Sequence, residues 1–481
     1  MEFYNDFEQN VKLFKDAFEK DTTFKIKYIK NKNLPDLRIA IAVVNCMVSN
    51  DVVDRDIIKP LCNNMISPDI EFVICSAVTA HTAVVEKDVT NALVSVAGGD
   101  CAIIIDNNPS VIVIDAKGMK QRDVSAPETE LSVAGPGEGF NENIMTSLSL
   151  LKKRLATPKL KSEFMMSGKQ SNSRYCICYL EGVVRPELVQ RLKKRLEKID
   201  IDYLGDSSYI AEFVQDNKTS FIKTYGKTNR PDVLAAKLLE GRVGIIFNGS
   251  PTALTFPFIF IENFQTPDDY YLNCYYANVG RALRFIGFFI SFLLPSAYIS
   301  ILLHHPSMLP HEWLYSISAS QTGVPIPSLL EMVLLFGIFE ALRETGARMP
   351  SSFGLALNIV GAVVLGQAAV DARLVSAPMV IVVSFSGIAG LMVYHLKGAV
   401  FYLRIVFILL GALAGLPGVA IAFALFLLLL YNMSSLGVPI MTAFSPFDKY
   451  SKSDTFFRMP MYKMNFRQSE FSENTKRQGR V

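Results

Sequence analysis

The sequence is poor in the residues that mark several common classes of protein. No two of its seven cysteines stand in CxxC spacing, and only one of its five histidines precedes residue 300. This pattern is not that of a zinc site or a disulfide framework, so we expect reduced thiols. The net charge of +3, with no long basic stripe interleaved with aromatic residues, argues against a nucleic-acid partner.

Catalytic and cofactor motifs are also lacking. Two segments are rich in glycine, 98–100 and 135–139, but neither has the lysine and hydroxyl of a P-loop or the spacing of a dinucleotide site after a strand. His81 has no partner in the sequence that would make it a base. We therefore predict turns and helix caps there, and we expect no enzyme activity, catalytic residue, metal or cofactor.

The first twenty residues do not resemble a signal peptide. They carry acidic residues and an aromatic stripe in place of a basic region followed by an apolar one. We therefore expect the polar half of the chain to stay in the cytoplasm.

Long apolar runs are abundant after residue 284. A run of about 20 apolar residues is long enough to cross a bilayer, and several in succession cannot all be buried in one soluble core. The candidate membrane spans are 284–304, 328–343, 353–371, 378–396, 399–416 and 417–433. With six spans, almost all flanking Lys and Arg residues face the side of the termini and Arg373 is nearly alone on the other, which predicts cytoplasmic termini.

The span 328–343 carries charges within its length. Glu331 lies in its first turn, and Glu340 can pair with Arg343 at i, i+3. Because a carboxylate inside a bilayer costs about 2.5–3.5 kcal/mol, these residues serve either as end-of-helix anchors or in coupling. The segment either crosses the membrane, which the charge bias favours, or inserts only in part.

The span 353–371 is unusually small and polar. Asn358 and Gln367 are nine positions apart and lie on opposite faces, among glycines that include Gly361. A polar amide in a bilayer must face protein or water, so the span either packs tightly or lines a conduit, in which Val363 or Val364 would help to form a hydrophobic gate.

The polar half contains an internal repeat. Residues 37–44 and 51–55 resemble 173–180 and 187–191, and in each copy a helix ending in glycine leads into two strands joined by a turn. The pairs Arg38/Arg174, Arg55/Arg191 and Pro109/Pro251 are preserved at a nearly constant offset.

The predicted fold class is an α/β soluble head of two similar tandem modules, followed by an all-α polytopic membrane domain of about six spans. The predicted boundaries are module 1 at 1–125, module 2 at 126–260, an amphipathic connector at 261–283, the membrane domain at 284–433 and a cytoplasmic tail at 434–481.

Several strings of residues resemble the spore germinant receptor A-subunit family. The resemblance rests on segments 239–251, 264–271, 294–298, 305–310, 366–370 and 454–464, with further matches in the head at 59–61, 127–130, 135–140 and 197–202. The sequence departs from the family at 44–48, where an aspartate-glycine turn is more common.

The resemblance implies a multi-pass protein of the spore inner membrane that acts with B and C subunits. The B subunit is the expected nutrient sensor. The A subunit is expected to oligomerise in the lipid into a germinant-gated channel for monovalent cations, with candidate pore or coupling residues Asn358, Gly361, Val363, Val364, Gln367, Glu331, Glu340 and Arg343.

Two alternatives stay open at this point. One is a paralogous stage V sporulation AF-type protein that works near the dipicolinate channel. The other is a secondary transporter, whose mark would be inverted repeats with broken spans in the membrane half.

Overall fold

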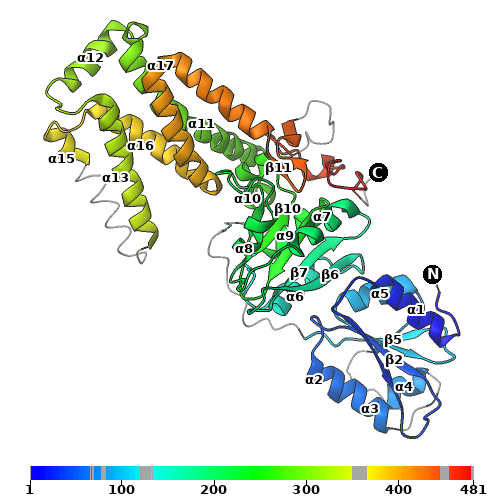
Figure 1. Cartoon of the computed structure of the whole chain (residues 1–481). Helices are drawn as coiled ribbons and strands as arrows, with labels where there is room; N and C mark the ends of the chain where they lie inside the picture. The colour runs from blue at the N-terminus through cyan, green and yellow to red at the C-terminus, as the bar shows by residue number, and fades with distance from the viewer. Residues whose placement is uncertain are drawn as a thin grey trace.

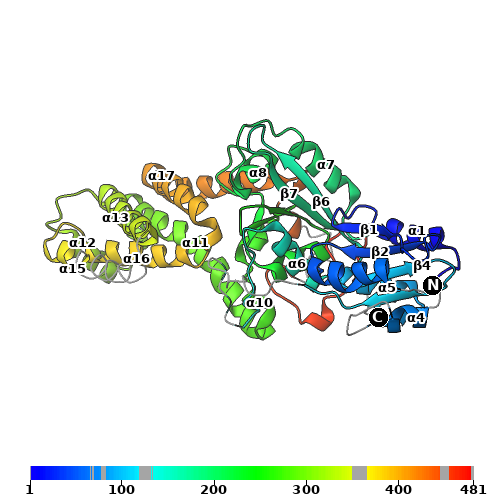
Figure 2. The same ribbon diagram turned by 90° about the horizontal axis from the view of Figure 1, so that it is seen from below.

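The computed structural model describes residues 2–64, 67, 70–76, 83–118, 130, 132, 134–348, 366–444 and 454–477. Two α/β modules are followed by a helical region (Figure 1). The second module lies between the first module and the helices in both views (Figure 2).

The first module is built around a five-stranded antiparallel sheet of order β1-β2-β4-β5-β3. Its elements are α1 (Phe7–Ala17), β1 (Phe24–Ile29), β2 (Ile39–Val44), α2 (Asn50–Val52), the π-helical η1 (Val53–Ile58), α3 (Lys59–Asn63), α4 (Ile70–Ser76), β3 (Ala83–Glu86), α5 (Val89–Ala97), β4 (Cys101–Ile105) and β5 (Val111–Ile114).

The second module has a sheet of the corresponding order, β6-β7-β9-β10-β8. Its elements are α6 (Ile144–Arg154), β6 (Leu160–Ser167), β7 (Ser173–Leu180), α7 (Pro186–Leu196), α8 (Ser207–Val214), β8 (Gly226–Thr228), α9 (Pro231–Leu239), β9 (Val243–Phe247) and β10 (Ala253–Phe256). The two sheets thus share one strand order, which is the arrangement that the sequence repeat predicts.

Helices cover both faces of each sheet, which explains why the central strands are apolar throughout. Along β2, Ile39 and Ile41 face one core while Ala40 and Ala42 face the other, because side chains alternate across a strand. The turn from helix to strand is made in both modules by a glycine with positive φ, Gly99 at 104° and Gly241 at 94°. Only glycine adopts this conformation without strain.

A buried ion pair joins the two modules. The Lys152 ammonium of α6 lies 2.5 Å from the Asp21 carboxylate, and both side chains are almost fully buried. Next to this pair, the Thr22 N–H donates to the carbonyl of Ser162 on β6 over 3.0 Å.

The helical region starts with two short helices and then a long one. Its elements are η2 (Phe260–Phe264), α10 (Asp268–Tyr271), α11 (Cys274–His304), η3 (Pro306–Met308), α12 (His311–Gln321), α13 (Ser328–Arg348), α15 (Gly366–Asp371), α16 (Ala377–Leu391), η5 (Tyr394–Leu396) and α17 (Lys397–Tyr431). The expected connector 261–283 is therefore η2, α10 and the first turns of α11, which begins ten residues before the expected span.

Two helical stretches of the described chain are long and apolar enough to cross a membrane, Cys274–His304 and Tyr394–Tyr431. The apolar helix α16 is shorter, and the expected span 353–371 falls mainly outside the described residues. Six spans therefore stay a prediction. The second stretch contains the expected fifth and sixth spans, which meet in a kink at Gly415 with φ 65°.

The kink turns α17 into a helical hairpin beside α11. The first leg is parallel to α11. Arg404 donates to the Ser291 carbonyl over 3.1 Å, and the Ala412 carbonyl accepts a hydrogen bond over 2.8 Å from His304, at the end of α11 far from the head. The second leg returns toward the head, where the rings of Phe426 and Phe292 are 6.0 Å apart.

The C-terminal segment packs back onto the second module. It forms a small hairpin of β11 (Ser434–Ser435) and β12 (Val438–Pro439), followed by η6 (Thr442–Phe444) and η8 (Met461–Lys463). Phe471 is fully buried, and the Phe260 N–H donates to the Ile440 carbonyl over 2.9 Å. The expected tail is thus, in its described part, a component of the head.

Candidate functional site

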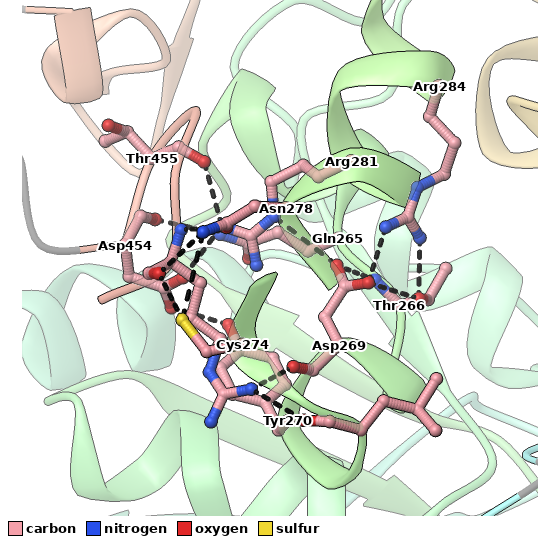
Figure 3. Close-up of polar contacts among 12 residues, drawn as sticks. Gln265, Thr266, Asp269, Tyr270, Cys274, Asn278, Arg281, Arg284, Asp454 and Thr455 are labelled. Atoms are coloured by element: carbon pink, nitrogen blue, oxygen red, sulfur yellow. Dashed lines mark hydrogen bonds and ion pairs between the residues drawn. The ribbon is translucent and has the colours of Figure 1, made fainter. Parts of the chain in front are cut away.

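A network of polar contacts lies where α10, the start of α11 and the C-terminal segment meet (Figure 3). Arg281 is its centre, since its side chain is only 1% exposed. It sits two turns into α11, before the apolar part of that helix. A cation buried there requires anionic partners, because an unpaired buried charge is strongly destabilising.

Asp269, in α10, is the first of these partners. Its carboxylate lies 3.4 Å from the Arg281 guanidinium and 2.5 Å from that of Arg284. The same carboxylate accepts hydrogen bonds from the backbone and hydroxyl of Thr266, over 3.2 and 3.1 Å. Asp269 lies in the first turn of α10, and through these contacts it joins α10 to α11.

Asp454, in the C-terminal segment, is the second partner. It lies 2.8 Å from Arg281 and accepts a 2.5 Å hydrogen bond from the Tyr270 hydroxyl. Burial, together with the negative charge of Asp454, raises the pKa of Tyr270 well above its ordinary value, so the hydroxyl stays protonated and donates.

Arg458 closes the network from the same segment. Its N–H donates to the Asn278 side chain over 2.6 Å, and its carbonyl accepts from Asn278 over 3.1 Å and from the Cys274 thiol over 2.9 Å. Its guanidinium donates to the backbone carbonyls of Asp269 and Leu272. The C-terminal segment is therefore hydrogen-bonded to the first turns of α11.

A cavity of about 900 Å³ adjoins the network. It lies between α9, the connector, the C-terminal segment and the turn from α16 to η5. One of its lining residues is Glu262, whose carboxylate lies 2.7 Å from the Lys237 ammonium and is paired with Arg242. Burial alone would raise the pKa of Glu262, but these two cations outweigh it and lower the pKa.

The first predicted coupling residue, Glu331, is buried inside the helical region. Its carboxylate accepts hydrogen bonds from the N–H and the hydroxyl of Ser376, over 2.5 and 2.7 Å. Because Ser376 is the N-cap of α16, Glu331 of α13 holds the start of the neighbouring helix. Glu331 thereby joins the first turn of α13 to the start of α16, while its anchoring or coupling role stays a prediction.

Glu340 and Arg343 form the predicted i, i+3 pair. The structure adds Arg404 of α17, which is buried, lies 3.3 Å from the Glu340 carboxylate and stacks 4.2 Å from the centre of the Phe336 ring. A second polar cluster therefore links α13, α17 and the backbone of α11.

Of the other predicted pore residues, the structure describes only Gln367. Gln367 is exposed on the short helix α15. Asn358, Gly361, Val363 and Val364 lie outside the described residues. Their roles stay predictions.

The sequence shows Arg281 and Arg404 as basic residues at the edge or inside of apolar segments, but it does not show that Asp454 and Glu340 are their partners. The available signal is their position: two arginines at the edge or inside of apolar helices need anionic partners. Among the described residues, no group of three or more His, Cys, Asp or Glu is placed to hold a metal ion.

Comparison with known proteins identifies the family of the chain. Residues 12–470 match the family described as Bacillus/Clostridium GerA spore germination protein. Spore germination protein KA of Bacillus subtilis (strain 168) is 32% identical over 461 residues, which are 95% of this chain and 85% of that protein. Spore germination protein A1 of the same organism is 34% identical over 373 residues, with 76% and 77% coverage.

A solved structure is also similar. The crystal structure of the N-terminal domain of the A subunit of the Bacillus megaterium spore germinant receptor GerK3 covers 53% of this chain and 96% of its own, with 24% sequence identity and a TM-score of 0.40. The family match spans both modules, the helices and the C-terminal segment. The resemblance found in the sequence is therefore confirmed: the chain belongs to the GerA family of spore germination proteins.

Proposed function

We propose that this protein is the A subunit of a nutrient germinant receptor of the spore inner membrane. It acts with B and C subunits and, as an oligomer, conducts monovalent cations when germinant binds. The observation that carries the proposal is the family match over residues 12–470. The two relatives named above are matched over 85% and 77% of their own length, and the family match spans the head, the helices and most of the C-terminal segment.

The course of the helices supports six membrane crossings. α11 leads away from the head, α13 and α16 lead back toward it, and the two legs of α17 lead out and return (Figure 1). The segment 353–371 would supply the remaining outward crossing. Both termini then lie on the head side, which the Lys and Arg distribution assigns to the cytoplasm.

Coupling between head and membrane runs through the network around Arg281. This arginine is part of α11, while its partners Asp269 and Asp454 belong to the connector and the C-terminal segment. A displacement of either element must move the start of α11 or break a buried ion pair. Because breaking such a pair costs about 3–5 kcal/mol, movement of the helix is the favoured response.

The ion path is formed by the segments 353–371 of several copies of the chain. This assignment rests on the small and polar residues of the segment. Replacing Asn358 by Leu removes a polar group and should leave insertion intact while it alters cation release. Val363→Ala or Val364→Ala should make the spore leak cations if either side chain narrows a hydrophobic gate. The measurement is cation release from spores before and after germinant addition.

Two variants serve as controls. Ile359→Val keeps an apolar side chain beside Asn358, and Ile421→Ala shortens an exposed side chain of α17. Both should release cations as the wild type does. Normal cation release by all three test variants at normal protein levels would contradict a pore role for 353–371.

A further inference from the structure

Three lysines from the head and from the helical region gather at the head end of the helices. Lys223 and Lys227 come from the second module and line the same cavity as Tyr394 and His395 of η5. Lys397 is the first residue of α17, and its ammonium lies 4.9 Å from the centre of the Tyr394 ring. The cluster therefore spans the boundary between head and membrane domain.

Apolar contacts hold this boundary in place. The rings of Phe221 in the head and Tyr402 on α17 are 5.8 Å apart. Ile222 is buried in the same core as Leu396 and Ala399, which flank Lys397. The head loop that carries Lys223 is thus packed on the first turns of α17.

The described residues supply one carboxylate within ion-pair distance of the three lysines. Lys227 lies 3.9 Å from the Asp206 carboxylate, whereas no carboxylate of the described residues lies within ion-pair distance of Lys223 or Lys397. The pKa of Lys223 is lowered, first by the protein packed around it and then by the positive charges of Lys227 and Lys397. Like charges brought together in this way repel one another unless an anion lies between them.

An apolar stripe begins one turn beyond the cluster. Phe401, Ile405 and Leu409 follow one another at intervals of four on α17, so they share one face of the helix, and all three are exposed. The lysines suit the phosphate of a phospholipid, and the exposed apolar stripe that follows them suits its acyl chains.

We propose that Lys223, Lys227 and Lys397 bind the phosphate of an anionic phospholipid of the inner leaflet, with its acyl chains along α17. The lipid phosphate bridges head and membrane domain and offsets the repulsion among the lysines. The proposal rests on the placement of the helices in a membrane and not on the channel role.

The test uses the full-length protein in nanodiscs of phosphatidylcholine, with or without a minority of phosphatidylglycerol, and native mass spectrometry to measure retained lipid. The wild type should retain phosphatidylglycerol in preference to phosphatidylcholine. Because each lysine near a membrane surface contributes about a fivefold preference, the triple variant K223Q/K227Q/K397Q should lose roughly a hundredfold. The triple variant K12Q/K25Q/K30Q removes the same charge from exposed positions of the first module and should keep the preference.

Three outcomes would overturn the proposal. The first is equal retention of both lipids by the wild type, and the second is an equal loss of preference in the two triple variants. The third is lysine-dependent binding of inorganic phosphate in detergent with no lipid preference, which would assign the site to a soluble anion. Insertion into the nanodiscs is scored separately, so a failure of the membrane placement is distinguishable from a failure of the lipid site.

Discussion

Individual buried charges of this protein are placed where elements from different parts of the chain meet. Arg281 joins α11 to the connector and the C-terminal segment, Arg404 joins α17 to α13, and Lys152 joins the two modules. Each is almost fully buried and has an anionic partner. Since burial makes an ion pair costly to break, these pairs favour one relative arrangement of the joined elements.

Glu262 gives a prediction at this scale. Its native pKa is below the ordinary value of 4.5, so its carboxylate contributes stability above that value and loses this contribution as the pH falls through the lowered pKa. Glu262→Gln leaves Lys237 and Arg242 without their anion and should destabilise by about 3–5 kcal/mol near neutral pH. The gap in thermal midpoint between the full-length wild type and the variant should narrow in acid.

The matched control is Glu187→Gln. This carboxylate is 75% exposed and lies 3.9 Å from Arg191, which is 50% exposed, so its loss should cost about 1 kcal/mol or less. A gap that widens in acid, or an effect of Glu262→Gln no larger than that of Glu187→Gln, would contradict the assignment.

Among the elements, α11 connects the head to the far end of the helical region. It begins in the polar network at Cys274 and ends at His304, beside the kink in α17. Its middle carries Phe288 and Phe292, which pack on both legs of the α17 hairpin. A shift of α11 at one end should therefore displace its contacts with both legs of the α17 hairpin.

A double-mutant cycle of Arg281→Met and Asp454→Asn tests whether the ion pair between these residues attaches the C-terminal segment to α11. The two changes remove the same buried pair, so their effects on stability should be non-additive by about 1–3 kcal/mol. The same variants should weaken the germinant response in spores. Stability is followed as the thermal midpoint by circular dichroism.

The exposed pair Arg348 and Glu344 provides the control cycle, since these side chains are 79% and 66% exposed. Arg348→Met with Glu344→Gln should be additive within about 0.5 kcal/mol. Additive effects in both cycles would show that Asp454 does not act on α11 through Arg281.

In the whole molecule, the second module, the long helices and the C-terminal segment share one hydrophobic core. It runs from Tyr175 in β7 through Phe288 and Phe407 to Phe471. The first module has cores of its own and is attached through the Asp21–Lys152 pair and the contact with β6. The first module is thus joined to the rest mainly by polar contacts, among which the buried Asp21–Lys152 pair favours one arrangement of the two modules.

The membrane topology is tested by thiol labelling in cells. Ser376, between the third and fourth expected spans, is unsuitable for labelling because it is buried against Glu331. Ser451, in the expected tail, lies outside the described residues. Leu374→Cys and Tyr462→Cys place the thiol at exposed positions, 50% and 69% exposed. An impermeant reagent added outside should label the first, and it should label the second only after permeabilisation.

The native cysteines provide an internal control, because the six in the head and Cys274 should stay unlabelled from outside. External labelling of Tyr462→Cys, or protection of Leu374→Cys until the membrane is opened, would contradict cytoplasmic termini.

Local patterns in the sequence predict the repeated strand and helix segments of the head and the main apolar helices, but not the edge strands β1, β3, β6 and β8. The repeat led to two sheets, and the glycine signals at Gly99 and Gly241 marked helix ends correctly, because turn chemistry and side-chain periodicity act over a few residues. Segments 284–304 and 399–433 were recognised as apolar because composition alone determines that property.

Only the tertiary structure decided which distant residues meet. Arg281 and Asp454 are 173 residues apart, and Glu331 and Ser376 are 45 apart. The described part of the predicted tail 434–481 packs against the second module, where Phe471 is fully buried. Periodicity shows that a helix has an apolar face or a charge that needs a partner, but not which element supplies it. That choice follows from how all the elements pack together, since each buried charge is stable only where the finished fold brings it a counter-charge.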